Sequence, residues 1–234
     1  MGVAQLCYSE NIDMNKRILS SFSALLLCFT MLAGIVYGLG TTTDVMLPLM
    51  EHYAPPKDTH LPAGEYPSVV NMITSYLRGE TDTFQHIFTV DSAEYTAFNQ
   101  KEQHHMADVQ RLFRLCSSFS LGSALMTVVI WCSTRRDSAF WQGVRRAIFC
   151  ALALISCLVL LACIDFDSLF ILFHRIAFRN DLWLLNPSTD LLIRLMPIEF
   201  FITYAAIIGG LWLAGMVGLL VVATIRIKKT TARE

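Results

Sequence analysis

The sequence predicts an all-α integral membrane protein, with four transmembrane helices and external loops whose short helices cap the bundle. Of the 234 residues, 54% are hydrophobic and 16% are charged, which is too apolar for an ordinary soluble domain. A helix needs about 20 apolar residues to cross the roughly 30 Å of hydrocarbon in a bilayer. Four segments are long enough, at residues 18–39, 115–132, 147–164 and 200–225.

The basic residues indicate how these segments are oriented. Bases cluster on one side of the four segments, and by the positive-inside rule that side is the cytoplasm. Both termini, 1–17 and 226–234, and the link 133–146 are therefore predicted to be cytoplasmic. Residues 40–114 and 165–199 then form two external loops of a multi-pass cell-membrane protein. The clustered bases are Lys16, Arg17, Arg135, Arg136, Arg145, Arg146, Arg226, Lys228, Lys229 and Arg233.

The first apolar segment is interpreted as a membrane helix. A cleaved secretory signal is disfavoured because the apolar run is long and no small-residue cleavage site follows it. In the first external loop, residues 41–48 are followed by a proline-rich turn that is predicted to be irregular, around Pro55, Pro56, Pro62 and Pro67.

Two helices are predicted in the rest of this loop. Apolar residues recur at helical spacing between residues 67 and 78, and Gly79 ends that helix. Residues 84–95 fit a short strand or a loop equally well. Asn99 and Glu102 form a capping pattern, so a second helix begins there and runs into the second membrane segment.

The second external loop is too polar to cross a bilayer, but its mixture of aromatic, acidic and basic residues suits a membrane surface. Aromatic residues between 170 and 178 recur at helical spacing, which predicts a short interfacial helix with His174 facing the lipid headgroups. Asn186, which precedes a proline, predicts the start of another helix that ends near Met196. Pro197 is predicted to open the last helix.

The sequence offers no support for a disulfide scaffold, a bound metal or a nucleotide cofactor. None of the seven cysteines lies in the body of an external loop, and no C-x-x-C spacing suitable for zinc occurs. No G-x-x-x-x-G-K-[ST] loop is present to bind ATP. No nucleic-acid partner is expected, and the sequence leaves the oligomeric state open.

Two of the six histidines, all of which fall in the predicted external loops, are candidates for catalysis. His105 and His174 each lie in a predicted helix near the outer end of a membrane segment, at the depth where a lipid ester linkage is presented. Asp108 shares a helix face with His105 and is the first candidate to orient it. His104 competes for the role given to His105.

The residues around both histidines form a recognisable set of motifs. They are H-H-M-A-D-V (residues 104–109), D-F-D (165–167) and F-H-R-I-A-F-R-N-D-L-W-L-L-N-P-S-T-D-L-L-I-R-L-M-P-I-E-F-F (173–201). In this order and with four membrane segments, they resemble the lipoprotein intramolecular transacylase family, known as Lit. Where that family often has two aromatic residues after the second histidine, this chain has Ala177 and Phe178.

The resemblance implies a bacterial membrane enzyme without cofactor or metal. Such enzymes move the sn-2 acyl chain of a diacylglyceryl-modified lipoprotein onto the α-amino group of its N-terminal cysteine, which leaves a lyso-form lipoprotein. The family's two external histidines correspond to His105 and His174, so the active site is expected on the outer face of the membrane. The implied partners are the lipoprotein substrate and membrane lipid.

Roles for the site residues follow from this chemistry. We expect His105 to be the general base that takes a proton from the attacking amine. His174 is expected to donate a hydrogen bond to the ester carbonyl or to assist return of the proton. Other side chains that can orient or support the histidines are Asp108, His104, Asp165, Asp167 and Asn186.

The acyl chains of the substrate are already in the bilayer, so entry from the side is expected to avoid moving them through water. A lipid-facing opening between membrane segments is therefore predicted near the two histidines. Its lining is expected to include Phe173, Trp183 and Phe201.

The sequence also leaves two other classes of protein open. One is a metal-dependent membrane hydrolase that uses the histidines and an aspartate, although no H-E-x-x-H or comparable ligand spacing occurs. The other is a non-enzymatic four-span scaffold with adhesive loops. An extracellular binding surface of that size often uses loop disulfides, and this chain has no loop cysteines for them.

Overall fold

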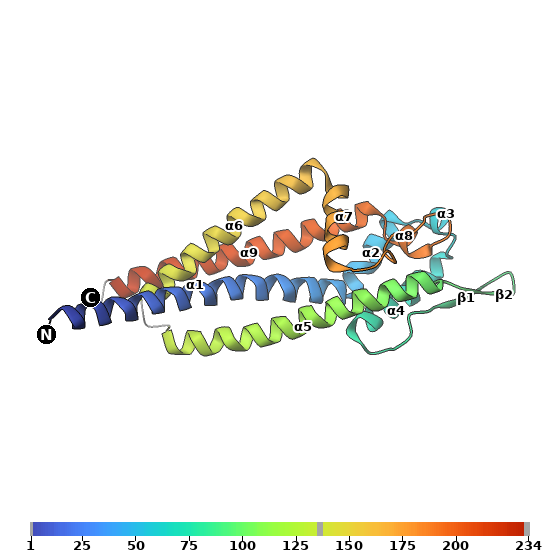
Figure 1. Cartoon of the computed structure of the whole chain (residues 1–234). Coiled ribbons are helices and arrows are strands. Elements are labelled where there is room, and N and C mark those ends of the chain that lie inside the picture. The colour runs from blue at the N-terminus through green and yellow to red at the C-terminus, as the bar shows by residue number, and fades with distance from the viewer. Residues whose placement is uncertain (1, 135–137, 232–234) are drawn as a thin grey trace. The chain divides into compact units, whose positions relative to one another are not determined.

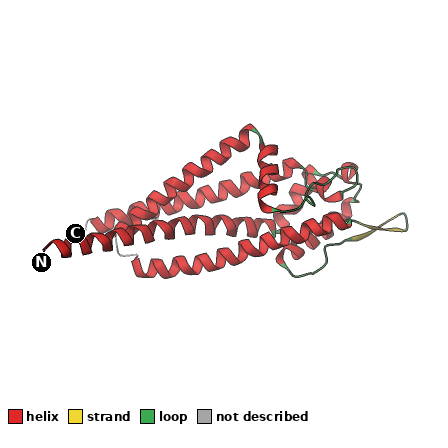
Figure 2. Cartoon of the chain, in the orientation of Figure 1, coloured by secondary structure: helices red, strands yellow, loops and turns green. Residues whose placement is uncertain are grey.

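The chain is mainly helical in a computed structural model, which describes residues 2–134 and 138–231, and the side chains of residues 18–132 and 140–230 (Figure 1). Four helices are long: α1 (Gly2–Gly40), α5 (Gln100–Thr134), α6 (Ser138–Ile164) and α9 (Ile198–Thr231). The shorter elements are α2 (Thr43–Tyr53), α3 (Pro56–Thr59), a 3-10 turn (Ala63–Glu65), α4 (Tyr66–Arg78), α7 (Phe166–Ala177) and α8 (Leu191–Leu195). Two short strands, β1 (Ile87–Val90) and β2 (Ala93–Thr96), complete the described chain (Figure 2).

All four long helices are sufficiently apolar to cross a bilayer, over Ile18–Gly40, Gln100–Cys132, Phe140–Ile164 and Ile198–Thr230. The predicted all-α membrane fold with four such helices is thereby confirmed. The helices are longer than the predicted segments. Most of the predicted link 133–146 is helical, because α5 continues to Thr134 and α6 begins at Ser138. Some residues of the predicted cytoplasmic segments lie outside the described residues, namely 1, 135–137 and 232–234.

Helix α5 extends well beyond the length that a bilayer requires. Its 35 residues correspond to about 50 Å at 1.5 Å per residue, against roughly 30 Å of hydrocarbon. The first turns carry Lys101, Glu102, Asp108 and Arg111, whereas no Asp, Glu, Lys or Arg occurs from residue 115 to Thr134. We therefore place the membrane-crossing part of α5 after Arg114, so His105 lies outside it.

The chain forms two compact units. The bundle unit comprises Met1–Gly34, Ser118–Leu160 and Gly209–Glu234, and the loop unit comprises Ile35–Ser117 and Leu161–Ile208. In the bundle unit, the Thr30 and Ser123 hydroxyls lie 2.5 Å apart, and the Trp212 indole donates to the Cys28 carbonyl at 2.9 Å. Its apolar side chains, such as Leu121 and Leu160, are largely exposed, as expected for helices that contact lipid.

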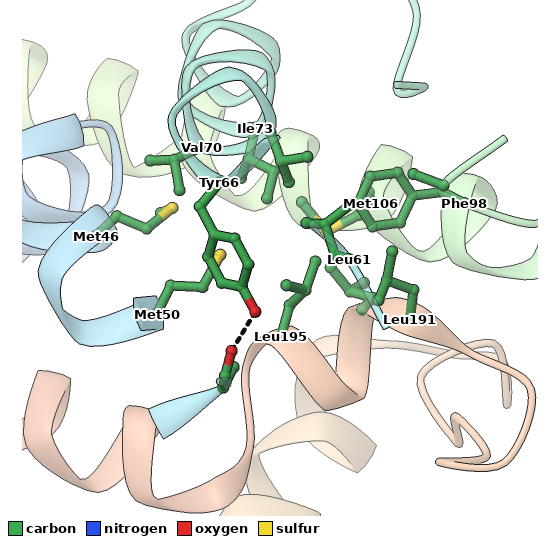
Figure 3. Close-up of a cluster of buried hydrophobic side chains, with 14 of the residues drawn as sticks. Met46, Met50, Leu61, Tyr66, Val70, Ile73, Phe98, Met106, Leu191 and Leu195 are labelled. Carbon is green, nitrogen blue, oxygen red and sulfur yellow. Dashed lines mark hydrogen bonds between the residues drawn. The ribbon is translucent and has the colours of Figure 1, made fainter. Parts of the chain in front are cut away.

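The loop unit has its own hydrophobic core. Buried side chains from α2, α4, the start of α5, α8 and the start of α9 meet there, including Met50, Ile73 and Leu195 (Figure 3). The Tyr66 hydroxyl donates a hydrogen bond to the backbone carbonyl of Ala54 within this core (Figure 3). Burial of each such aliphatic side chain contributes about 1.5–3 kcal/mol. This core gives the two predicted external loops a shared, folded framework.

The segment that the sequence left undecided is a β-hairpin. β1 and β2 pair antiparallel, with Val90 opposite Ala93. Asp91 and Ser92 both have positive φ, at 51° and 67°, as the two-residue hairpin turn requires. Helix α4 ends as predicted, with Gly79 in the left-handed region at φ 77°.

Two details of the predicted loops were wrong. The proline-rich part of the first loop is not irregular throughout, because α3 and the 3-10 turn form within it, and α2, which includes Pro48, precedes it although the sequence analysis did not identify that helix. In the second loop no helix starts at Asn186. The Asn186 carbonyl instead accepts bonds from Thr189 and Asp190 in a turn, and α8 begins at Leu191. Pro197 precedes the start of α9, as expected.

Candidate active site

Helix α7 carries the second candidate histidine. Asp165 caps its first turn, because one carboxylate oxygen accepts from the Ser168 backbone N–H at 3.0 Å and the other accepts from the Ser168 hydroxyl. Asp167 lies in the first turn, where the helix dipole favours an acid. Both aspartates are exposed and both therefore act on the helix itself. The helix ends because Phe178 adopts an extended backbone conformation, and its N–H donates to the His174 carbonyl at 2.9 Å.

The expectation that His174 faces lipid headgroups was wrong, because its side chain is buried. Four aromatic rings surround it, with centroids at 4.2 Å for Phe170, 5.2 Å for Phe173, 5.5 Å for Phe178 and 5.0 Å for Trp183. Nδ1 of His174 lies 2.8 Å from the Phe170 carbonyl oxygen, one helical turn earlier. A carbonyl oxygen can only accept, so Nδ1 carries the proton and Nε2 of the neutral ring carries the lone pair.

The first histidine is positioned by the start of α5. The Glu102 N–H donates to the Asn99 side-chain oxygen at 3.1 Å, and the Asn99 N–H donates to Glu102 at 2.7 Å. This is the reciprocal cap that the sequence predicted. His105 follows one turn later and is buried, whereas His104 beside it is exposed. The structure thereby distinguishes two histidines that the sequence could not.

The two candidates form what we call the histidine pair, His105 and His174. Their ring centroids are 6.1 Å apart, with 34° between the ring planes. Phe178 contacts both rings, at 5.2 Å from His105 and 5.5 Å from His174. Two side chains separated by 69 positions in the sequence are thus placed where one small reacting group can touch both.

The surroundings keep the histidine pair neutral near pH 7. The pKa of His105 is lowered to about 4, mainly by burial and also by the neighbouring His174 ring, against a smaller opposing effect of Asp108. Burial also lowers the pKa of His174, although the bond to the Phe170 carbonyl opposes this. Nδ1 of His105 is buried without a hydrogen-bond partner in the described structure. A neutral imidazole retains a lone pair and can accept a proton.

Asp108 is close to the histidine pair but does not bond to either ring. One of its oxygens accepts from Asn180 at 2.8 Å and the other accepts from Arg111 at 2.7 Å. Asp108 therefore joins α5 to the segment that follows α7. The interaction with His105 is electrostatic and acts over a longer range.

Three more contacts join the start of α5 to the second loop. The buried carboxylate of Glu102 accepts from the Leu192 N–H at 2.6 Å, at the start of α8. The Asn99 side-chain amide donates to Asp190 at 2.8 Å, and the Lys101 ammonium donates to the Leu184 carbonyl at 2.5 Å. We call this set, with the Asp108–Asn180 bond, the loop clasp. It holds the helix of His105 against the loop that contains His174.

The three expected cavity residues lie around the histidine pair in different ways. Trp183 lines a cavity of about 340 Å³, which Phe178 also lines. Phe173 contacts the His174 ring but is largely exposed. Phe201, from α9, packs against Phe170 with centroids 5.0 Å apart, so it supports a ring that contacts His174.

Asn186 forms hydrogen bonds within a turn of the second loop. Its side chain accepts from the Ser188 N–H at 3.0 Å, and its own N–H donates to Asp190 at 2.7 Å, which stabilises the turn before α8. No three His, Cys, Asp or Glu side chains converge into a metal-binding group within the described residues. The metal-dependent hydrolase therefore gains no support from ligand geometry.

Sequence reasoning did not assign three residues to this site, although it named Glu102 as a capping residue. Phe170 supplies the carbonyl that orients His174, and any residue there would offer the same carbonyl. Asn180 and the buried Glu102 act across the two loops, which no local pattern reveals. The capping pattern could have indicated the role of Glu102. The cap uses one oxygen of the carboxylate, and the other oxygen then needs a second donor, which is the Leu192 N–H.

Comparison with known proteins places this arrangement in context. The chain matches the model of the family described as "Lipoprotein intramolecular transacylase Lit" over residues 18–201. A search of curated proteins found no match. A solved structure of the membrane-integral lipoprotein intramolecular transacylase Lit from Bacillus cereus has a TM-score of 0.73 at 18% identity, and the alignment covers 95% of this chain and 99% of that one.

Two further structures of the Bacillus cereus protein carry a single histidine substitution, to arginine in one and to alanine in the other. Their TM-scores are 0.70 and 0.68, each at 19% identity. The alignments cover 100% of both chains in the first case, and 97% of this chain and 99% of that one in the second. At this level of identity the likeness shows a shared fold.

Proposed function

Because the chain belongs to the lipoprotein intramolecular transacylase (Lit) family, we propose that it moves the sn-2 acyl chain of a diacylglyceryl lipoprotein onto the α-amino group of that lipoprotein's N-terminal cysteine. The product is an N-acylated lyso-form lipoprotein. The observation that carries this proposal for the site is the buried pair of neutral histidines, His105 and His174, with ring centroids 6.1 Å apart.

The reaction requires one proton to move from nitrogen to oxygen. The amine nitrogen attacks the ester carbonyl carbon, a C–N bond forms, and the C–O bond to the sn-2 oxygen breaks. The nitrogen loses one proton and the sn-2 oxygen gains one. A neutral imidazole can accept the proton from nitrogen and, once protonated, can donate it to oxygen. General acid–base catalysis of this kind typically raises the reaction rate by about 10²–10⁴-fold.

His105 is the base in this proposal, because burial keeps it neutral at the pH where it must accept the amine proton. The imidazolium so formed can then donate to the oxyanion of the tetrahedral intermediate. His174 has its proton on Nδ1, bonded to the Phe170 carbonyl. Its Nε2 therefore has no proton to donate until it receives the amine proton that His105 has taken up, and it can then pass that proton on. Of the two roles expected for His174, return of the proton to the sn-2 oxygen agrees better with this tautomer.

No cofactor is needed for this chemistry, because exchange of an ester for an amide is downhill. The amine and the ester also belong to one molecule. Holding them in contact lowers the barrier by several kcal/mol, out of the roughly 7–11 kcal/mol available to well-oriented intramolecular reactions. The aromatic rings around the histidine pair provide an apolar wall against which the glyceryl group can be held.

The site is proposed to lie at the outer face of the membrane, with both termini in the cytoplasm. Helix α7 supports an interfacial location, because it buries His174 and exposes the apolar side chains of Leu172, Phe173 and Ile176. Entry of the substrate from the lipid keeps its acyl chains out of water, which would otherwise cost about 0.8 kcal/mol per CH₂. These exposed side chains are a suitable surface for that approach.

The test is expression in a bacterium that lacks N-acylated lipoproteins, followed by mass spectrometry of N-terminal lipopeptides. Intramolecular transfer leaves the total mass unchanged and moves one acyl chain to nitrogen, so fragmentation must change at constant mass. The wild type is expected to convert the lipoproteins. His105→Ala and His174→Ala are each expected to lower conversion by about 10²–10⁴-fold.

His104→Ala is the matched control, because His104 is the adjacent but exposed histidine. It is expected to retain activity. An unchanged fragment pattern with well-expressed wild-type protein would contradict the proposed function. Full conversion by His105→Ala would leave the reaction possible but remove the histidine pair from it.

A further inference from the structure

A cavity of about 340 Å³ lies next to the histidine pair and has no part in the acid–base chemistry. Two of its walls, Phe178 and Trp183, also contact His174, at 5.5 Å and 5.0 Å between ring centroids. The other lining side chains include Arg175, Arg179, Asn180 and Asp181. The cavity is therefore apolar on the side of the histidine pair and polar beyond it.

The charged groups of this cavity lack charged partners. Arg175, Arg179 and Asp181 are exposed, and none of them takes part in a salt bridge in the described part of the chain. Elsewhere in the loop unit arginines do pair with acids, as Arg111 does with Asp108 and Arg78 with Glu80. The cavity thus presents both guanidinium donors and a carboxylate acceptor to whatever enters it.

This mixture of groups distinguishes between ligands. A phospholipid phosphate would bind the two guanidinium groups but would be repelled by the carboxylate of Asp181. A peptide main chain needs both kinds of group, because its carbonyls accept from guanidinium and its N–H groups donate to carboxylate. The volume lies at the lower end of the roughly 300–1,000 Å³ of ligand sites, which suits a short stretch of chain.

The distances also agree with a peptide. The cysteine of the proposed substrate carries both the amine and the diacylglyceryl group, so it must sit at the histidine pair. Its carbonyl leads to the next residue, and each extended residue spans about 3.3–3.6 Å. Since Phe178 and Trp183 border both places, one or two residues are enough to carry the chain from His174 into the cavity.

We propose that this cavity binds the main chain of the residues that directly follow the lipidated cysteine of the substrate. The proposal rests on the proposed function and specifies which part of the lipoprotein the enzyme holds. Arg175 and Arg179 bind backbone carbonyls, and Asp181 accepts from a backbone N–H. Binding through the main chain lets one enzyme accept lipoproteins with different sequences after the cysteine.

The test compares two synthetic substrates with the purified full-length enzyme in detergent. One is diacylglyceryl-cysteine amide, and the other is a four-residue lipopeptide that begins with the same cysteine. The wild type is expected to have a KM about tenfold lower for the lipopeptide, which corresponds to one charged hydrogen bond. The double variant Arg175→Gln/Arg179→Gln is expected to raise the KM for the lipopeptide about tenfold and to leave that for the amide unchanged.

Arg114→Gln is the matched control, an exposed arginine of the same unit that lies outside the cavity. It is expected to preserve the difference between the two substrates. Equal KM values for both substrates in the wild type would overturn the proposal, and so would a double variant that still discriminates between them. Weaker binding of the double variant to phosphatidylglycerol vesicles, with substrate discrimination intact, would assign the arginines to lipid phosphate instead. Failure of the proposed function is a separate outcome, because the wild type would then convert neither substrate.

Discussion

Burial separates His105 from His104 at the scale of single residues. The two are adjacent in sequence, but successive helical residues differ by about 100° in direction. His105 therefore points inward to His174 while His104 remains exposed. A buried imidazole with a lowered pKa stays neutral, which is the form that a base requires. The same burial leaves Nδ1 of His105 without a partner, a cost that a purely structural residue would avoid.

The substitution Asp108→Asn is expected to lower kcat/KM by about tenfold, and His105→Asn by about 10²–10⁴-fold. Asp108 acts on His105 through its charge and on the loop through its bonds to Asn180 and Arg111. Asn retains the shape and one acceptor, so part of the contact survives. Asp82→Asn, at an exposed position of the same unit, serves as control. If the substitutions at positions 105 and 108 abolished activity equally, Asp108 would have a direct catalytic role and not only an orienting one.

The pH dependence of kcat/KM follows from the lowered pKa values of the histidine pair. The substrate amine, with a reference pKa of about 7.7–8.0, protonates as the pH falls, so log kcat/KM is expected to decline with a slope of one. Because the pKa of His105 lies at about 4, no second decline is expected near pH 6.5. A slope that steepens to two close to pH 6.5 would show that a catalytic histidine has an ordinary pKa.

The same shifts have a consequence for stability. A histidine whose pKa is lower in the folded state binds its proton more readily in the unfolded chain. As the pH falls below about 6.5, protonation therefore favours unfolding, and the stability due to the neutral His105 is lost between about 6.5 and its folded pKa of about 4.

At the scale of secondary-structure elements, the loop clasp joins the start of α5 to the second loop. Helix α5 begins with the Asn99–Glu102 cap, and the second oxygen of Glu102 binds the start of α8. The Asp190 carboxylate accepts one hydrogen bond from the Asn99 side-chain amide and another from the Asn186 N–H. Hydrogen bonds to charged groups contribute about 1.5–3 kcal/mol each, so the clasp fixes α5 against the second loop strongly.

The substitution Glu102→Gln is expected to destabilise the loop unit and to lower activity without removing a catalytic group. Gln presents one acceptor where two N–H donors meet, so one buried donor loses its partner at a cost of about 1–3 kcal/mol. The expected result is a melting temperature lower by several degrees and a smaller kcat/KM. Glu94→Gln on the exposed hairpin is the control. A Glu102→Gln enzyme with unchanged melting temperature and activity would show that the clasp does not position His105.

At the scale of the whole molecule, a folded loop unit accompanies the membrane-crossing helices. Its core draws on α2, α4, α5, α8 and α9, and so on both predicted external loops. Loops that fold as helices satisfy their own backbone hydrogen bonds, which suits a location at the edge of the bilayer. The polar first turns of α5 belong to this unit, which explains why that helix is longer than a bilayer needs.

The proposed topology can be measured by cysteine labelling of intact cells with a membrane-impermeant reagent. Single cysteines introduced at the exposed positions Ser68 and Ser188 are expected to react. A cysteine at Lys229, near the C-terminal end of α9, is expected to react after the cells are opened. The parent chain controls for its own cysteines. The opposite labelling pattern would reverse the proposed orientation.

The sequence by itself determined the elements that depend on local patterns. Length and hydropathy identified four membrane helices, and capping chemistry located the start of α5 at Asn99 and the end of α4 at Gly79. Their places in predicted helices near the outer ends of membrane segments selected His105 and His174 as candidates. Asn186 shows the limit of such reasoning, because a helix start and an isolated turn use the same Asn-Pro signal, and contacts with Asp190 favoured the turn.

Tertiary structure decided whatever depends on residues far apart in the chain. The burial of His174, the difference in burial between His105 and His104, and the second partner of Glu102 all arise where the two loops pack together. A local pattern records which face of a helix is apolar, but not which ring or N–H from another loop will meet that face. The histidine pair is neutral because of these contacts between the two loops, since burial by distant residues lowers both pKa values.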